Sequence, residues 1–128
     1  MEPRFDYESA SALLPEARRR IGEIAELSAS LQQLALAIRS EEVAEGDVPR
    51  AKALEAQLDD ELGWFREHGV IVKGVAPALL DFPARAVVDG ERREVLLCWR
   101  EGEEALAWYH SEELGYLGRA PIAELDEV

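Results

Sequence analysis

The sequence predicts an α+β fold, in which a long antiparallel helical hairpin in the N-terminal half packs on a small antiparallel β-meander in the C-terminal half. Apolar residues recur every three or four positions over residues 14–38 and again over 51–65, whereas after Gly69 the apolar period changes to two. With 128 residues and 48% hydrophobic composition, the chain is long enough to bury one core. We expect one domain over residues 1–128, with the hairpin at about 7–68, the β-rich part at about 70–110, and a turn and acidic tail at 111–128.

The first predicted helix has the strongest periodic signal. Asp6 can cap its first turn. Pro15 lacks a backbone N–H and clashes with the preceding turn, so we expect it to kink or restart the helix, with the main helix at about 15–43. Eight positions alternate spacings of three and four without a break and form an apolar seam: Leu14, Ala17, Ile21, Ile24, Ser28, Leu31, Ala35 and Ile38.

The second predicted helix follows a turn at 44–47. Asp47 supplies a side-chain cap, Pro49 is tolerated in the first turn, and Gly69 ends the helix. A connection of about four residues makes two consecutive helices antiparallel. The apolar positions of this helix are Ala51, Leu54, Leu58, Leu62 and Phe65.

Two hairpin turns are predicted in the β-rich part. The turn at Asp89-Gly90 pairs residues whose numbers sum to 179, and the turn at Glu101-Gly102 pairs residues whose numbers sum to 203. Pro83 weakens the first register near Asp81. One face should pack on the helices: Phe82, Ala84, Ala86, Val95, Leu97, Trp99, Leu106 and Trp108. The other carries a cross-strand ion pair between Arg85 and Glu94, together with Asp81, Leu96, Cys98, Ala105, Ala107 and Tyr109.

The charge excludes several classes of function. The 27 acidic and 14 basic residues give a net charge of −13, divided evenly between the two halves of the chain. Nucleic-acid and membrane-surface binders need a cationic patch, so neither partner is expected. No apolar run reaches the roughly 18 residues of a membrane span, the chain start does not resemble a signal peptide, and Cys98 is the single cysteine. We therefore expect a cytoplasmic protein without an internal disulfide.

The hairpin has three interpretations. Its seam can be an intramolecular core, a surface for self-association as a homodimer, or a surface for a foreign protein partner. The leading hypothesis is a non-enzymatic protein that self-associates through the hairpin. An alternative of a different class is a small-ligand or divalent-metal-binding protein, including a hydrolase or lyase. No other cofactor is predicted, because the sequence contains no phosphate loop or dinucleotide fingerprint.

The candidate ligand-binding residues come from separate segments. Asp81 lies among apolar residues, His110 ends a predicted strand, and Arg119 follows a glycine-containing loop, so they could hold an anion or a metal together with Glu103. Each also has a structural interpretation as a hydrogen-bonded or turn residue. Cys98 is interpreted as a buried structural thiol. The remaining candidates are Trp99, Trp108 and Tyr116 as aromatic lining, and Asp81, His110 and Glu113 as metal ligands, with Glu103 and Cys98 as further donors.

Several motifs in fixed order resemble an uncharacterised bacterial family, domain of unknown function 2203. They are Leu80-Asp81-Phe82-Pro83, Leu97-Cys98-Trp99, and residues 5, 14–16, 69–73, 100–103, 108–110 and 115–121, which together span nearly the whole chain. The resemblance implies a helical N-terminal half and a β-rich C-terminal half, without an activity. Ala78 replaces a family glycine, and the inserted Tyr109 would turn His110 to the opposite strand face. A shared site should lie among Asp81, Cys98, Trp99, Glu103, His110, Gly115 and Arg119.

Overall fold

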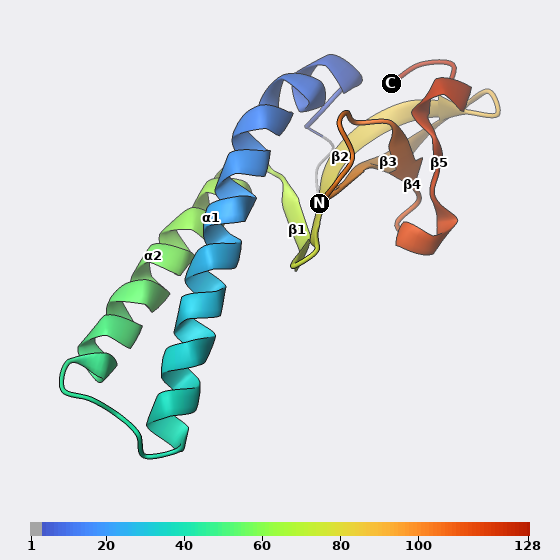
Figure 1. The fold of residues 1–128 in the computed structure, drawn as a ribbon. Helices are drawn as coiled ribbons and strands as arrows, with labels where there is room; N and C mark the ends of the chain where they lie inside the picture. The colour runs from blue at the N-terminus through green and yellow to red at the C-terminus, as the bar shows by residue number, and fades with distance from the viewer. Residues whose placement is uncertain (1–3) are drawn as a thin grey trace.

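A computed structural model describes residues 4–128, which form two helices followed by a five-stranded antiparallel sheet (Figure 1). The strands pair in chain order, and short 3-10 turns flank the last strand. The predicted α+β class, with a helical hairpin packed on an antiparallel meander, is confirmed. The elements are α1 (Tyr7–Arg39), α2 (Asp47–His68), β1 (Ile71–Val75), β2 (Ala78–Val88), β3 (Glu91–Arg100), β4 (Trp108–His110), η1 (Tyr116–Gly118), β5 (Ala120–Pro121) and η2 (Ile122–Glu124).

Helix α1 begins as predicted but is longer and unbroken at Pro15. Asp6 forms a capping box, in which the Ser9 backbone N–H donates to Asp6 Oδ1 at 2.7 Å and the Asp6 N–H donates to Ser9 Oγ at 3.0 Å. The expected restart at Pro15 is wrong, because buried neighbours anchor the helix on both sides of the proline. The helix ends at Arg39 rather than at residue 43, where Ser40 Oγ donates to the Leu36 carbonyl at 2.9 Å.

Helix α2 ends as predicted but is capped differently at its start. Gly69 adopts a positive φ of 76°, and the Val70 N–H donates to the Phe65 carbonyl at 3.0 Å. The expected side-chain cap by Asp47 is wrong, since Gly46 is the N-cap residue and has no side chain. Asp47 Oδ2 instead accepts the Ala44 backbone N–H at 2.8 Å and closes the loop between the helices.

The register of β2 with β3 is the predicted one. Asp81 lies opposite Cys98. From Leu79 to Val88, each β2 residue pairs with the β3 residue whose number brings the sum to 179, and Pro83 does not interrupt this register. Arg85 and Glu94 are opposite each other, but no ion pair joins them in the described residues 4–128.

The predicted register of β3 with β4 is wrong by three residues. Leu97 lies opposite Tyr109 rather than Leu106. The reason is a wider loop over residues 101–107, in which Trp99 Nε1 donates to the Glu103 carbonyl and the Arg100 N–H donates to Glu103 Oε1. A shift by an odd number exchanges the two faces of β4. Trp108 therefore lies on the same face as Cys98, not on the core face where it is predicted. Tyr109 lies on the core face instead and packs against the core.

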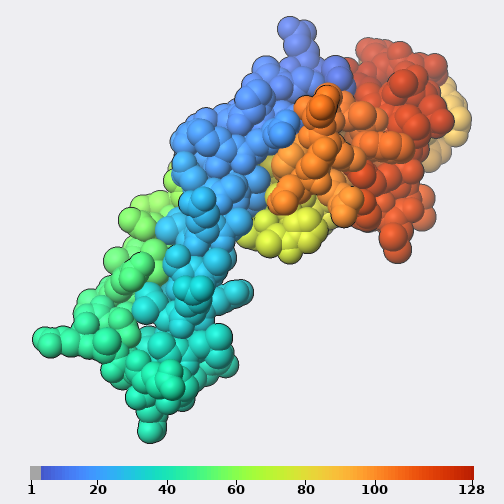
Figure 2. Space-filling view, in the orientation of Figure 1, coloured from blue at the N-terminus to red at the C-terminus, as the bar shows by residue number. Residues whose placement is uncertain are grey.

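One face of the sheet packs on the helices, and the hairpin extends well past it (Figures 1 and 2). Leu106 is buried in this core although it lies in the loop rather than in a strand. Within residues 4–128, no helix has both the length and the hydropathy that crossing a membrane requires. The strand residues of the core include Leu80, Phe82, Ala84, Ala86, Val95, Leu97 and Trp99.

The apolar seam divides into two parts. The proximal seam lies beside the sheet and is 0–5% exposed: Leu14, Ala17, Ile21 and Ile24. In the distal seam Ala35 is exposed and the other three residues are half-buried: Ser28, Leu31 and Ile38. The whole seam is therefore not buried within one chain.

Candidate functional site

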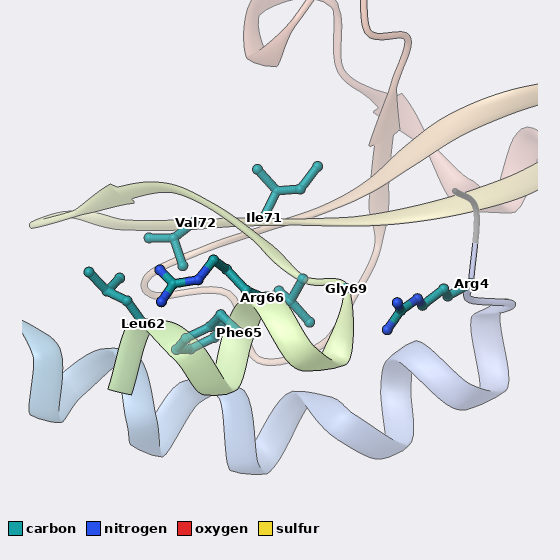
Figure 3. A pocket seen from close by; sticks show the side chains of 8 residues that line it. Arg4, Leu62, Phe65, Arg66, Gly69, Ile71 and Val72 are labelled. Carbon is teal, nitrogen blue, oxygen red and sulfur yellow. The ribbon is translucent and has the colours of Figure 1, made fainter. Parts of the chain in front are cut away.

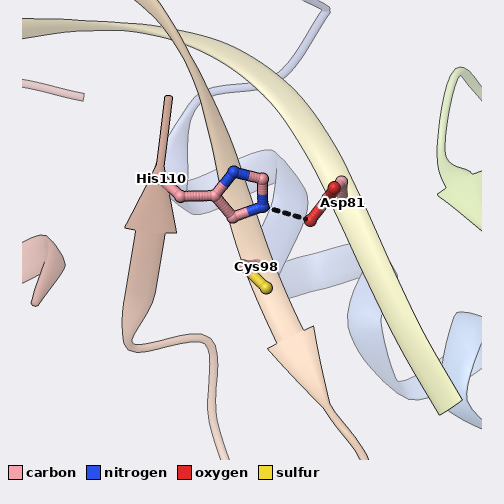
Figure 4. A group of neighbouring side chains, drawn as sticks. All are labelled: Asp81, Cys98 and His110. Carbon is pink, nitrogen blue, oxygen red and sulfur yellow. Dashed lines mark hydrogen bonds and ion pairs between the residues drawn. The ribbon is translucent and has the colours of Figure 1, made fainter. Parts of the chain in front are cut away.

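A buried polar cluster lies on the sheet face that points away from the helices. Asp81 on β2, Cys98 on β3 and His110 at the end of β4 point toward one another (Figure 4). Their potential ligand atoms all lie within 4.8 Å of one another, and the three residues are 1%, 0% and 3% exposed. We call these three residues the Asp–Cys–His cluster. Three groups with metal-binding chemistry therefore meet inside the sheet, away from solvent.

The contact between His110 and Asp81 constrains where protons lie. His110 Nε2 is 3.0 Å from Asp81 Oδ1, and His110 Nδ1 is 2.8 Å from the Ser111 carbonyl oxygen. A carbonyl only accepts, so Nδ1 carries a proton and donates it. The Nε2 lone pair of a neutral ring would then face a carboxylate oxygen. A proton shared between these two atoms, or a metal ion bound by both, would resolve this contact.

Asp81 also has an oxygen with no hydrogen-bond partner. Oδ2 is buried and unpaired in the described residues, although burying an unpaired carboxylate oxygen is costly. In natural structures such groups are rare, and they often mark an ion or water that completes the site.

The register of β4 brings His110 into the cluster. In the predicted register, Tyr109 shared the face of Asp81 and the inserted residue turned His110 away from it. That expectation is wrong, because the observed register places His110 opposite Leu96 and on the face of Asp81 and Cys98. The signal for Cys98 was available from the sequence, since the Asp89-Gly90 turn already placed it opposite Asp81.

Glu103 and Arg119 form a second, separate pair. Arg119 Nη2 donates to Glu103 Oε1 at 2.7 Å and to the Cys98 carbonyl at 3.2 Å. The guanidinium carbon lies 5.1 Å from the Trp108 ring centre and 4.9 Å from that of Tyr116. The four predicted ligand residues thus meet as two pairs, which the Cys98 backbone connects. Arg119 is already occupied by its carboxylate partner.

Two of the predicted candidates lie elsewhere. Glu113 is exposed in the segment after β4 and does not belong to the Asp–Cys–His cluster, where Cys98 takes its place. Trp99 points to the helix side, where its indole nitrogen donates to the Glu103 carbonyl and the Arg18 guanidinium lies 5.3 Å from its ring centre. Of the three aromatic candidates, Trp108 and Tyr116 therefore contact a predicted ligand residue through their rings.

The thiol of Cys98 is a poor free nucleophile. Burial and the negative charge of Asp81 raise its pKa to about 12, while Arg119 acts in the opposite direction. The thiol is therefore protonated at neutral pH, whereas catalytic cysteines need a lowered pKa. This argues against covalent catalysis by Cys98 on its own.

A cavity of about 670 Å³ lies away from both polar pairs, at the junction of α2 and β1 (Figure 3). Its floor is apolar, and Arg4 and Arg66 approach it from opposite ends. Arg4 donates to the Glu67 carbonyl at 2.7 Å, at the C-terminal end of α2. Arg66 Nη2 lies 3.6 Å from Asp59 Oδ1, so both arginines at this cavity already have partners within the chain.

One comparison with known proteins gives a match. A family model described as "Uncharacterized conserved protein (DUF2203)" matches residues 4–122, which is most of the chain. No curated protein and no solved structure is similar enough to the chain to match it.

Proposed function

The chain belongs to the DUF2203 family of uncharacterised conserved proteins, and from this premise we propose that it is a non-enzymatic interaction protein whose helical hairpin joins two copies of the chain. The family description names no activity. The proposal also places the protein in the cytoplasm, the compartment that its single, unpaired cysteine favours.

The incomplete burial of the hairpin carries this proposal. The distal half of the hairpin stands clear of the sheet, so α2 is the one element of residues 4–128 that covers the distal seam (Figures 1 and 2). Leu36 is 59% exposed, and Val43 and Val48 are each 46% exposed in the same region. An apolar helix pair without a covering layer gains free energy when another surface covers it.

A second copy of the chain is a fitting partner. Two helical hairpins that pack about a two-fold axis form a four-helix bundle, which covers the half-buried faces of both hairpins at once. Ser28 and Ala35 are small enough to allow close approach of helices. Residues 25–61 include nine acidic and three basic residues, so the two copies repel each other at low salt. Association should therefore rest on apolar contact and strengthen as the salt concentration rises.

Light scattering coupled to size exclusion tests this proposal. We expect a mass of twice 14.3 kDa at micromolar concentration, with a larger dimer fraction at high salt. Leu36→Glu should lower the mass to that of one chain. Leu117→Glu is the matched control, because Leu117 is 95% exposed but lies outside the hairpin. A monomer at every concentration and salt would overturn the proposal, and a dimer that Leu36→Glu leaves intact would show that the copies meet elsewhere.

A second candidate function, binding of a small ligand or a divalent metal, is favoured by a separate observation. The contact of Asp81 with His110 brings together two of the four predicted ligand residues in a buried position. Retention of a metal by the purified protein, measured by elemental analysis, tests it. This function does not depend on the oligomeric state.

A further inference from the structure

We propose that Asp81, Cys98 and His110 together bind one divalent metal ion of the thiolate-preferring class, to which zinc and cobalt belong. This proposal deepens the second candidate function and rests on it. It changes the predicted ligand set, because Cys98 replaces the exposed Glu113.

The spacing of the three donors fits a tetrahedral ion. Zinc bonds of about 2.0 to 2.3 Å place neighbouring ligand atoms about 3.3 to 3.7 Å apart. The donor atoms of the Asp–Cys–His cluster lie within 4.8 Å of one another, and His110 Nε2 and Asp81 Oδ1 are 3.0 Å apart. Adjustments of about 1 Å or less, within reach of side-chain rotation, bring the donors to coordination distance.

The histidine is oriented as a ligand would be. Its Nδ1–H donates to the Ser111 carbonyl, which holds the ring and leaves Nε2 as the free donor atom. Metal-binding histidines are commonly fixed by such a hydrogen bond from the other ring nitrogen. Nε2 points at Asp81 Oδ1, and the neighbouring Oδ2 is buried without a partner. A cation among these atoms would satisfy the unpaired oxygen as well as the nitrogen.

The charges and donor types select the class of ion. One carboxylate and one thiolate neutralise a divalent cation, and the nearby Arg119–Glu103 pair is neutral by itself. The buried site would then carry no net charge, which a low-dielectric interior favours. Imidazole and thiolate prefer zinc-like ions, whereas calcium and magnesium prefer oxygen ligands. Coordination also deprotonates a thiol directly.

The proposed role of the ion is to hold three strands together. Asp81, Cys98 and His110 come from β2, β3 and β4, and β4 has only three residues. Because all three donors are buried, a substrate cannot reach the ion in this conformation. Local opening of the short β4 would let the ion enter. A shared proton between Nε2 and Oδ1 is the rival arrangement, but it leaves Oδ2 unpaired.

Metal loading of the full-length protein tests the proposal. Protein stripped by a chelator is dialysed against Zn²⁺, Co²⁺ or Mg²⁺, and bound metal is measured by elemental analysis. We expect one zinc or cobalt ion per chain and no magnesium. The cobalt form should show a thiolate-to-cobalt charge-transfer band in the near ultraviolet, which reports Cys98 directly because the chain has one cysteine.

Three variants identify the ligands. Cys98→Ser should abolish the charge-transfer band and weaken zinc binding by about a hundredfold or more. His68→Gln changes the only other histidine, and Glu113→Gln removes the acid that does not belong to the cluster, so both should bind like the unmodified protein. Circular dichroism checks folding of each variant.

The outcomes separate this proposal from the function on which it rests. Metal retained without a thiolate band, and unaffected by Cys98→Ser, would leave metal binding standing but overturn this ligand set. No retention of zinc or cobalt by the unmodified protein would overturn this proposal together with the metal-binding form of the second candidate function, and would favour the shared proton. The cobalt spectrum of the unmodified protein decides the role of Cys98 even if Cys98→Ser does not fold.

Discussion

The two halves of α1 have the same apolar spacing but lie in different surroundings. The proximal seam packs between the sheet and the end of α2, and its four residues are at most 5% exposed. Among the described elements, α2 alone lies beside the distal seam, and no residue of this seam is buried. The comparison shows that periodicity predicts a helix and its apolar face, whereas the depth of burial depends on which layers cover that face.

Truncating one isoleucine in each half gives the largest expected contrast. Ile24→Ala removes a side chain that is 1% exposed and should lower the free energy of unfolding by about 2–5 kcal/mol. Ile38→Ala removes a half-buried side chain and should cost about 1 kcal/mol. Urea denaturation followed by circular dichroism measures both. If two hairpins pair, the cost of Ile38→Ala should grow with protein concentration; equal costs would contradict the division of the seam.

Gly46 and Gly69, which cap the two ends of α2, allow a second comparison between the distal end of the hairpin and the end beside the sheet. Both have positive φ, 89° at Gly46 and 76° at Gly69, so alanine should cost about 1–2 kcal/mol from backbone strain at either position. A Cβ at Gly46 would meet no atom of the described part of the chain within 4 Å, whereas at Gly69 it would lie 2.8 Å from Arg4 Cδ. Gly69→Ala should therefore cost more than Gly46→Ala, because Arg4 must move and break its hydrogen bond to the Glu67 carbonyl. A larger cost at Gly46 in thermal unfolding would refute this explanation.

The smallest expected effect is a pH dependence in the proximal half. Hydrogen bonds from Arg19 and Arg20 lower the pKa of Glu16 from its usual 4.5. Below pH 4.5 the unfolded chain then binds more protons than the folded chain, so stability falls as the pH drops through the lowered pKa. Glu16→Gln should flatten this acid-side slope in urea denaturation at a series of pH values. An unchanged slope would show that Glu16 contributes nothing to it.

In the Asp–Cys–His cluster, one contact could be predicted from the sequence and another could not. The pairing of Asp81 with Cys98 follows from the Asp89-Gly90 turn, whose preferred geometry sets the register of the strands next to it. The contact of Asp81 with His110 was not predictable in this way. It depends on a loop that is closed by Trp99 and Glu103 and anchored by burial of Leu106.

The amino-acid sequence by itself determined the two helices, the turn between them, the glycine that ends α2 and the β2–β3 hairpin. These features depend on spacing, caps and turn residues that act over a few positions of the chain. Only the tertiary structure decided that the proximal seam is buried while the distal seam is not, and that His110 meets Asp81 and Cys98. Both outcomes depend on contacts between segments far apart in the chain, because burial and cross-strand neighbours arise only when the layers pack.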